Sequence, residues 1–272
     1  MGGFILCLNT STIQPADLMT KISVTAEAGF QGIELWADDV DAFVADGGSL
    51  DEIKAALADR GLSVPSFIAV HDWGNTQGQA FTAAWDEARR RIALAAELGA
   101  PVIVATPPDG QVDVDLLVER YARLVALGRE HGVRIAFEFL GFLAHINNLP
   151  LAWEIVQRAG DPDGCLTVDS FHIYRSGRSL NDLRAVPPER IGIVHVNDVP
   201  GDVPVSELTD ADRVMPGDGV GVGREMLAIL AEKGYRGAVS LELFNRSYWE
   251  RPPAEVARIA FEKLQGILPA EA

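Results

Sequence analysis

Cysteine is scarce in this sequence of 272 residues, in which Cys7 and Cys165 are the only two. Each lies within an apolar run of strand length, and no CxxC pair is present. A disulfide framework needs several paired cysteines, and a closed structural zinc site usually draws on cysteine ligands. The sequence therefore argues against both. We expect two buried, reduced thiols in a reducing compartment.

The sequence also has few positively charged residues and no long apolar run. The chain has 23 lysine and arginine residues against 39 acidic ones, for a net charge of −16. Nucleic acids and anionic membranes both bind cationic surfaces, so the charge balance argues against either partner. No run approaches the roughly 18 apolar residues of a membrane helix, and the N-terminus lacks the basic and apolar regions of a signal peptide. We expect a cytoplasmic protein that contacts no membrane.

What the sequence does contain is an alternation of short apolar strands and amphipathic helices. Hydrophobic residues make up 48% of the chain and charged residues 23%, which is the profile of a globular protein with a large core. Eight predicted strands begin near residues 4, 32, 64, 102, 134, 165, 191 and 237, and a helical pattern follows each. Strands separated by helices run parallel. Eight such units predict an α/β protein with a closed (β/α)8 TIM barrel, a single domain over residues 1–272.

Local signals support this interpretation. Pro15 stands where a first helical residue is expected, and Ser49 with Glu52 forms the pattern of a capping box. A doubly wound open sheet is the alternative, but it requires a glycine-rich phosphate loop after the first strand. Residues 9–12 read NTST instead, so we favour the barrel.

Four consecutive predicted strands end in residues of the types that bind metals. The fifth to eighth strands deliver, in order, Glu138, Asp169, His195 and Glu242. In a TIM barrel the C-terminal strand ends face the active site, and neighbouring strands lie about 4.8 Å apart. The four side chains are therefore expected to converge. A single carboxylate at a strand end is more often a loop or helix cap, but four such ends in succession favour a metal site.

The charges of these residues lead to the same conclusion. Three carboxylates within contact distance repel one another strongly unless a cation lies between them. One divalent cation leaves a single excess negative charge, which a polar site tolerates. Three oxygen ligands and one imidazole suit Zn²⁺, Mn²⁺, Co²⁺ or Mg²⁺, and the ligand types alone do not select among these ions. The predicted cofactor is therefore one divalent metal ion with open coordination positions, as catalysis requires.

These strand ends resemble those of the xylose isomerase-like superfamily of TIM-barrel sugar isomerases and epimerases. The resemblance extends over essentially the whole chain and rests on FEFLG at 137–141, DSFH at 169–172, HVND at 195–198 and ELF at 242–244. Within the superfamily, the C-terminal half is most similar to the inosose isomerases, also called 2-keto-myo-inositol isomerases. The added signals are LTDADRVMPGDG at 208–219 and SLELFNR at 240–246.

The resemblance implies that Glu138, Asp169, His195 and Glu242 bind one divalent metal, and that Glu138 and Glu242 also serve as acid and base. It implies a metal-dependent isomerase, an intramolecular oxidoreductase, acting on a small keto-sugar or inosose. Chelation of a carbonyl and its neighbouring hydroxyl acidifies the adjacent C–H. One carboxylate then removes that proton to give a cis-enediolate, and the second returns a proton to the next carbon.

Three further residues near strand ends are candidates for substrate binding. Glu34 and His71 end the second and third predicted strands, so both are expected to line the pocket. His172 is expected in the loop that leaves the sixth strand. It either hydrogen-bonds a substrate hydroxyl or braces Asp169, and we favour contact with the substrate.

Arg213 is the fourth candidate for substrate binding. It lies in residues 197–222, the longest irregular connection in the predicted fold. Its guanidinium either closes over the substrate or pairs with one of two neighbouring acids, Asp210 or Asp212.

Other activities are compatible with the same metal site. A ketose 3-epimerase returns the proton to the same carbon, and hydroxypyruvate-type isomerases and dehydroshikimate-type dehydratases also fit these ligands. The abasic-site endonucleases of the superfamily require additional histidines, including one in an Asp-x-His sequence where this chain reads Asp212-Arg213-Val214. Together with the net charge of −16, that departure argues against a nuclease. A barrel that binds a metal and a polyol without turnover is a separate alternative.

Overall fold

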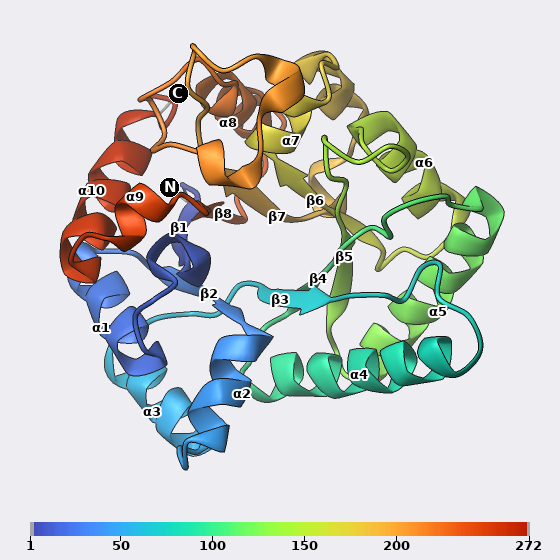
Figure 1. Cartoon of the computed structure of the whole chain (residues 1–272), viewed down its shortest axis with the longest axis horizontal. Coiled ribbons are helices and arrows are strands. Elements are labelled where there is room, and N and C mark those ends of the chain that lie inside the picture. The colour runs from blue at the N-terminus through green and yellow to red at the C-terminus, as the bar shows by residue number, and fades with distance from the viewer. Residues whose placement is uncertain (1–2, 271–272) are drawn as a thin grey trace.

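Eight parallel strands close into one barrel, which confirms the predicted TIM-barrel fold (Figure 1). The computed structural model describes residues 3–270. Each strand pairs with its neighbours in sequence, and the first strand closes the sheet against the last. The strands are β1 (Ile5–Asn9), β2 (Gly32–Trp36), β3 (Phe67–Val70), β4 (Val102–Ala105), β5 (Arg134–Phe137), β6 (Cys165–Asp169), β7 (Ile191–Val196) and β8 (Ala238–Leu241).

Helices form an outer ring around the strands (Figure 1). The α-helices are α1 (Leu18–Ala28), α2 (Ala37–Ala45), α3 (Leu50–Asp59), α4 (Gly78–Glu97), α5 (Val114–Glu130), α6 (Leu149–Arg158), α7 (Ser170–Arg175), α8 (Gly223–Glu232), α9 (Arg246–Trp249) and α10 (Pro253–Gly266). Short 3₁₀ helices are η1 (Thr10–Ile13), η2 (Leu180–Ala185), η3 (Pro188–Arg190), η4 (Val205–Glu207) and η5 (Asp210–Asp212). Within residues 3–270, no helix combines the length and the apolar character that spanning a membrane requires.

Capping explains where several helices begin, and it corrects one prediction. Ser49 and Glu52 form the expected reciprocal capping box at the start of α3. Pro15, however, is not the first residue of α1. That helix begins at Leu18, because the Asp17 side chain accepts a hydrogen bond from the Thr20 backbone N–H and so caps the first turn.

The predicted strands three, five and eight are longer than the observed ones. The apolar runs that mark them cover residues 64–70, 133–139 and 237–244 of the sequence, whereas β3, β5 and β8 each contain four residues. Several of the extra apolar residues are buried in the connections at the strand ends, among them Val64, Val133, Phe139 and Leu243. Hydrophobic runs predict burial, and burial continues beyond the last hydrogen-bonded residue of a barrel strand.

Alternation along the strands decides which side chains face the barrel interior. On β6, Leu166 and Val168 belong to the apolar core between the sheet and the helices, so Thr167 and Asp169 face inward. The same alternation applies to β5, β7 and β8, where Phe137, Val194 and Val239 pack outward while Ala136, Ile193 and Ser240 face the barrel interior. The inward positions continue directly into the predicted metal ligands.

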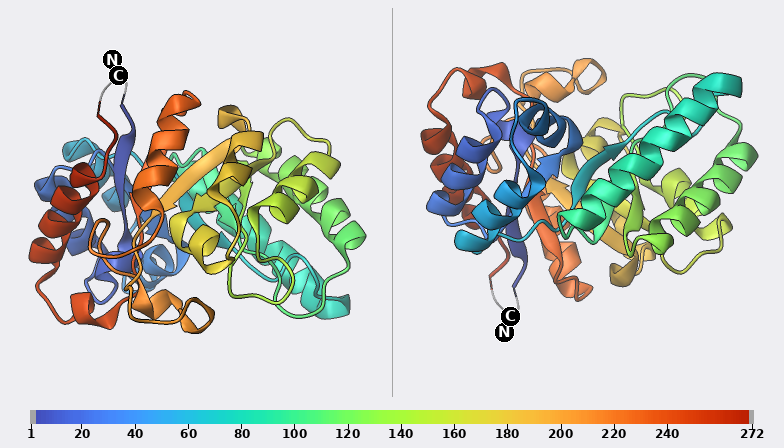
Figure 2. Two further views of the ribbon diagram at one scale, coloured as in Figure 1. Left: turned by 90° about the horizontal axis from the view of Figure 1, so that it is seen from above. Right: turned by 90° about the horizontal axis from the view of Figure 1, so that it is seen from below.

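Strand register brings these inward positions to one level. Asp169 lies opposite His195 in the β6–β7 pair, and His195 lies opposite Ser240 in the β7–β8 pair. Glu242 follows Ser240 by two residues and therefore faces the same side. The connection formed by residues 197–222 lies at this end of the barrel, opposite the end from which β1 enters the sheet (Figure 2).

Candidate metal centre

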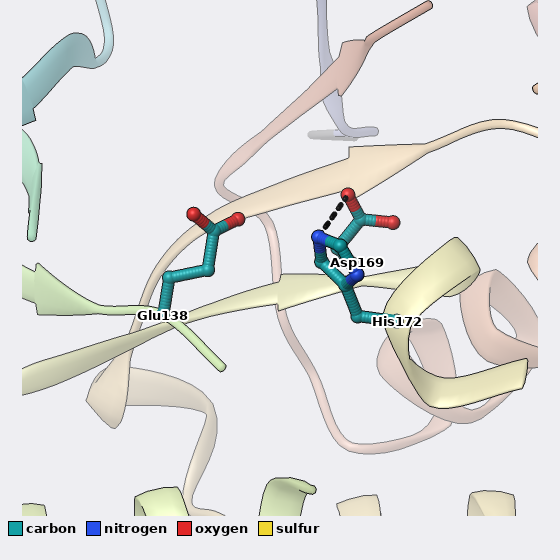
Figure 3. Close-up of side chains that lie close together, drawn as sticks. All are labelled: Glu138, Asp169 and His172. Carbon is teal, nitrogen blue, oxygen red and sulfur yellow. Dashed lines mark ion pairs between the residues drawn. The ribbon is translucent and has the colours of Figure 1, made fainter. Parts of the chain in front are cut away.

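The four predicted ligands come together at the C-terminal ends of their strands. Asp169 is the last residue of β6 and His195 lies near the end of β7, whereas Glu138 and Glu242 each follow the last residue of their strand. All four side chains are buried. Figure 3 shows Glu138 beside Asp169, with His172 from α7 adjoining them. Burial of three carboxylates at one place is costly without a compensating cation.

The carboxylates converge on one nitrogen of His195. Its Nδ1 lies 3.4 Å from Glu242 Oε2, 3.6 Å from Glu138 Oε1 and 3.9 Å from Asp169 Oδ2. This buried nitrogen has no hydrogen-bond partner within the described residues. Donor atoms of Asp169, His195 and Glu242 all lie within 4.8 Å of one another. A divalent cation about 2.0–2.2 Å from each donor would satisfy the orphaned nitrogen and neutralise the acids, so the residues fit the predicted metal.

Glu34 holds His195 in the orientation that metal binding requires. The His195 Nε2 atom lies 3.0 Å from the Glu34 carboxylate, which accepts a hydrogen bond from Nε2–H, so the lone pair is on Nδ1 whenever the ring is neutral, as it is in a metal-bound histidine. Burial lowers the pKa of His195, but the charges of Glu242 and Glu34 outweigh burial and raise it. Glu34 is fully buried behind His195. Its position therefore departs from the expected contact with substrate.

Asn9 connects Glu34 to Glu242, one of the four predicted ligands. Its side-chain oxygen accepts hydrogen bonds from Trp36 Nε1 and from the Ser11 backbone N–H. The Asn9 Nδ2 atom must then be the donor, and it bonds to Glu34 and to Glu242 Oε1, both at 2.9 Å. One oxygen of Glu242 is thereby held by β1, and the other is left facing His195.

Arg213 places a positive charge directly against two of the ligands. Its Nη1 atom lies 2.8 Å from Asp169 Oδ2 and 2.7 Å from Glu242 Oε2. The predicted pairing with a neighbouring acid also occurs, and the partner is Asp210. Asp212 instead accepts hydrogen bonds from Thr209 at the start of η5.

The two predicted ligands that contact Arg213 differ in their acidity. Burial raises the pKa of Asp169, but the charge of Arg213, aided by the neighbouring histidines, more than offsets burial, and the pKa falls to about 2. Burial raises the pKa of Glu242 to about 8, because the charges of His195 and Arg213 that lower it are opposed by those of Asp169 and Glu138. Glu138 lies outside this network of hydrogen bonds.

His172 lies in the first turn of α7, not in a loop as predicted, because α7 starts directly after β6. The Gly141 backbone N–H donates to His172 Nδ1 over 3.2 Å. A side chain on Gly141 would collide with the His172 carbonyl oxygen, so glycine is required for this approach. Burial lowers the pKa of His172, so the ring is neutral and its proton is on Nε2. That atom lies 3.2 Å from Arg213 Nη2 and 3.9 Å from Asp169 Oδ2 (Figure 3).

His71 is at the rim of the site, directly after β3. Its Nδ1 atom lies 2.9 Å from Thr106 Oγ1, and Thr106 donates its own proton to the Val70 carbonyl oxygen. His71 Nδ1 must therefore be the donor, which leaves the lone pair on Nε2. Burial and the charge of Arg91 lower the pKa of His71, so its ring is neutral. The side chain retains exposed surface, as a residue that contacts substrate must.

The sequence interpretation missed several residues that support the ligands. The sequence interpretation gives no supporting role to Asn9, which belongs to the NTST segment at residues 9–12, or to Asn197, which belongs to the HVND motif. The Asn197 amide donates to Asp169 Oδ1 over 3.1 Å. Asp210 was considered only as an alternative partner for Arg213. The available signal was the same for both asparagines, because each is a polar residue at the end of a predicted buried strand.

Comparison with known proteins places these residues in a family. Residues 22–266 match the family model described as the xylose isomerase-like TIM barrel. The inosose isomerase of Halalkalibacterium halodurans is 30% identical over 94% of this chain and 93% of that protein. The 3-dehydroshikimate dehydratase of Pseudomonas putida is 28% identical over 88% of this chain, which spans 38% of that protein. The crystal structure of the IolI protein with a bound zinc atom superposes with a TM-score of 0.90, at 25% identity and 98% coverage of both chains.

Proposed function

Because the chain belongs to the xylose isomerase-like TIM barrel family, we propose that it is a divalent-metal-dependent isomerase of an inosose-type keto-polyol such as 2-keto-myo-inositol. The observation that carries this proposal is the convergence of three acids on a His195 nitrogen that has no hydrogen-bond partner among residues 3–270. Two of these acids, Glu138 and Glu242, are also the proposed proton-transfer groups. The reaction is an internal redistribution of hydrogen through a cis-enediolate.

Glu138, Asp169, His195 and Glu242 are the proposed ligands of one divalent ion. When bound, this ion polarises the substrate carbonyl and acidifies the neighbouring C–H. Zn²⁺, Mn²⁺, Co²⁺ and Mg²⁺ all fit three oxygens and one imidazole. The zinc atom in the structure of the IolI protein is consistent with the first of these.

Glu138 and Glu242 are the proposed acid and base. Glu242 is held on both oxygens by Asn9 and Arg213, whereas Glu138 approaches His195 Nδ1 at 3.6 Å without being tied into that network. Glu138 is therefore the freer of the two to take a proton from carbon, and Glu242 returns a proton to the neighbouring carbon. In the reverse reaction the two exchange roles. Positioned proton transfer of this kind contributes roughly 10²–10⁴-fold to the rate.

His172 and Arg213 supply a site for one substrate oxygen. The His172 Nε2–H and an Arg213 Nη2–H face each other over 3.2 Å, so neither group is an acceptor for the other. A hydroxyl or carbonyl oxygen accepts two hydrogen bonds and would satisfy both. His71 adds an acceptor at the rim, because its lone pair is on Nε2. His172, Arg213 and His71 together therefore favour a polyhydroxylated ligand.

The charge of the site favours a neutral substrate over a carboxylic acid. Arg213 contacts three carboxylates, those of Asp169, Asp210 and Glu242, so its single positive charge is already outweighed. A substrate carboxylate would meet excess negative charge there. Dehydroshikimate and hydroxypyruvate are both carboxylic acids, whereas inososes and ketoses are neutral. This contrast favours an inosose isomerase and leaves a ketose 3-epimerase as the second candidate.

A deuterium-exchange experiment tests the proposed function. Protein loaded with Zn²⁺ or Mn²⁺ is incubated in D₂O with 2-keto-myo-inositol, ketohexoses, hydroxypyruvate or 3-dehydroshikimate, and NMR identifies the carbon that exchanges. We expect exchange beside the carbonyl of 2-keto-myo-inositol and the appearance of an isomer with the carbonyl moved by one carbon. Exchange with inversion at one carbon of a ketohexose would instead establish the epimerase. No exchange into any of the four would leave a barrel that binds without turnover.

Three broader proposals accompany this function. We propose a small-molecule keto-sugar or inosose as the partner, a cytoplasmic location and a single domain over residues 1–272. Support comes from the net charge of −16, which opposes binding to nucleic acids and anionic membranes. The ring of elements from Ile5 to Gly266 supports the single domain.

A further inference from the structure

One oxygen of each ligand acid next to Arg213 is already engaged elsewhere. Asp169 Oδ1 accepts hydrogen bonds from the Phe171 backbone N–H and from Asn197, and Glu242 Oε1 accepts one from Asn9. The remaining oxygens, Asp169 Oδ2 and Glu242 Oε2, are the ones that face His195 Nδ1. They are therefore the two oxygens with which these acids would bind a metal.

Arg213 Nη1 holds those same two oxygens, at 2.8 Å and 2.7 Å. We infer that Arg213 is a fixed cation that shares Asp169 and Glu242 with the metal and thereby weakens divalent-cation binding at this site. The inference rests on the proposed function only in taking these acids as metal ligands. It assigns to Arg213 an action on the metal that is separate from its contact with substrate.

The guanidinium is held firmly in this position. Asp210 Oδ1 accepts hydrogen bonds from its Nε and Nη2 atoms. The rings of Phe171 and Phe244 lie 4.6 Å and 5.2 Å from its central carbon, and they place the cation over two aromatic faces. Arg213 is 1% exposed, and such a cation cannot move into solvent without losing these contacts.

The backbone around Arg213 is equally constrained. Val214 and Asp198 form an antiparallel bridge with two backbone hydrogen bonds, and Asn245 donates to the Arg213 carbonyl oxygen. Asp198 in turn accepts hydrogen bonds from the backbone N–H groups of Gly217 and Gly221. These bonds hold the start of the 197–222 connection against its end. The loop therefore delivers Arg213 as a preorganised part of the site.

The energetic consequence follows from the sign of the charges. Two cations bound to the same oxygens lie close enough to repel each other, and the low dielectric of a buried site strengthens that repulsion. Before metal binds, Arg213 compensates the buried acids and stabilises the fold. After metal binds, Arg213 draws charge from the same carboxylates, so the ion is held less tightly. A merely structural arginine would have the opposite effect, because it would position the ligands and strengthen metal binding.

Two substitutions of opposite expected sign test this inference by isothermal titration with Mn²⁺ and Zn²⁺. In Arg213→Gln the competing cation is gone, so we expect the Kd to fall about tenfold or more. In Asp210→Asn the cation stays while its counter-charge is lost, so we expect the Kd to rise about threefold or more. Thermal unfolding in EDTA gives a second readout. Arg213→Gln should unfold at a lower temperature than the parent protein and should be stabilised more by added metal.

The outcomes separate this inference from the proposed function. A Kd that rises in both Arg213→Gln and Asp210→Asn would show that Arg213 positions the ligands and would overturn the inference. If Arg213→Gln does not fold without metal, Arg213→Lys retains the charge, and its Kd must stay within about threefold of the parent value while that of Asp210→Asn rises. If the parent protein binds neither ion, the metal site and the proposed function fail together. The inference that Arg213 weakens metal binding then fails with them.

Discussion

The two halves of the barrel contribute to the site in different ways. Strands β5–β8 supply all four proposed ligands, and each ligand lies at or just beyond its own strand end. Strands β1–β4 supply the groups that hold them: Asn9 against Glu242, and Glu34 against His195. At the rim, β3 is followed by His71, which β4 orients through Thr106.

This difference shows how a closed barrel separates binding from orientation. The ligands are neighbours along the sheet, because the β6–β7 and β7–β8 registers set Asp169, His195 and Ser240 at one level. Two of their supporting groups come from strands distant in the sequence, with separations of 161 residues for Glu34 and His195 and 233 for Asn9 and Glu242, because β1 closes the barrel against β8.

The largest effects are expected in the ligand half. Glu138→Gln and Glu242→Gln should each reduce deuterium exchange by roughly 10²–10⁴-fold, because each removes a proton-transfer group. Asp169→Asn should in addition lose the metal, as measured by metal content after dialysis. Glu154→Gln is the matched control, since this glutamate lies exposed on α6 and should retain full activity. Undiminished turnover in Glu242→Gln would rule out the proposed mechanism.

A smaller effect is expected from the supporting half. Glu34→Gln keeps the shape of the side chain but loses the charge that orients His195, so metal affinity should fall by about 10–100-fold. Isothermal titration with Zn²⁺ measures the change. An unchanged Kd in this variant would mean that the ring of His195 is positioned by its packing alone.

Acidification should weaken metal binding. Burial raises the pKa of Glu242 to about 8, and the surrounding acids raise the pKa of His195 despite its burial. Both groups therefore hold protons at pH 7 before metal arrives, and binding must displace them. Affinity should rise as the pH is increased from 6 to 8. Titrations at pH 7 in buffers of different ionisation enthalpy should report net proton release, and heats that are independent of the buffer would contradict this assignment.

His71 should affect the substrate without affecting the metal. In His71→Asn the acceptor at the rim is lost, and one lost hydrogen bond predicts a rise in KM of roughly tenfold. Metal affinity should equal that of the parent protein, in contrast to Glu34→Gln. A fall in metal affinity in His71→Asn would place this residue among the supporting groups instead.

The smallest expected effect lies far from the site, at the start of α3. Ser49→Ala removes the capping box formed with Glu52, which should lower the free energy of unfolding by about 1 kcal/mol. Urea denaturation measures this change. Metal affinity and activity should be unaffected, because α3 lies in the outer ring of helices. A loss of metal binding in this variant would indicate that the barrel and the site are less independent than the structure implies.

Much of the fold could be predicted because its signals are local. Apolar runs separated by helical patterns marked all eight strands, and four of the strand ends carried ligand-type residues. Strand limits were less well predicted at β3, β5 and β8, because burial extends beyond the paired residues. Pro15 precedes α1 and is not its first residue, because the capping contact of Asp17 starts the helix at Leu18.

The roles of the polar residues were harder to predict, because they depend on contacts across the barrel. Glu34 and Glu138 look alike in the sequence, since each is an acid at the end of an apolar run. Only closure of the sheet places Glu34 behind His195 Nε2 and Glu138 in front of Nδ1. Arg213 had two alternative interpretations in the sequence, and the structure shows contacts with Asp210 and with two proposed ligands together.

The sequence by itself determined the barrel and the residues offered at its strand ends, because a period of two along each strand sets which side chains face inward. The tertiary structure decided which of those residues can meet and which nitrogen of His195 has no partner in the described part of the chain. It also decided that Arg213 faces the oxygens proposed to bind the metal. The physical reason is that hydrogen bonds and charge pairs act over a few ångströms, and only the closed barrel brings residues so distant in the chain within that range.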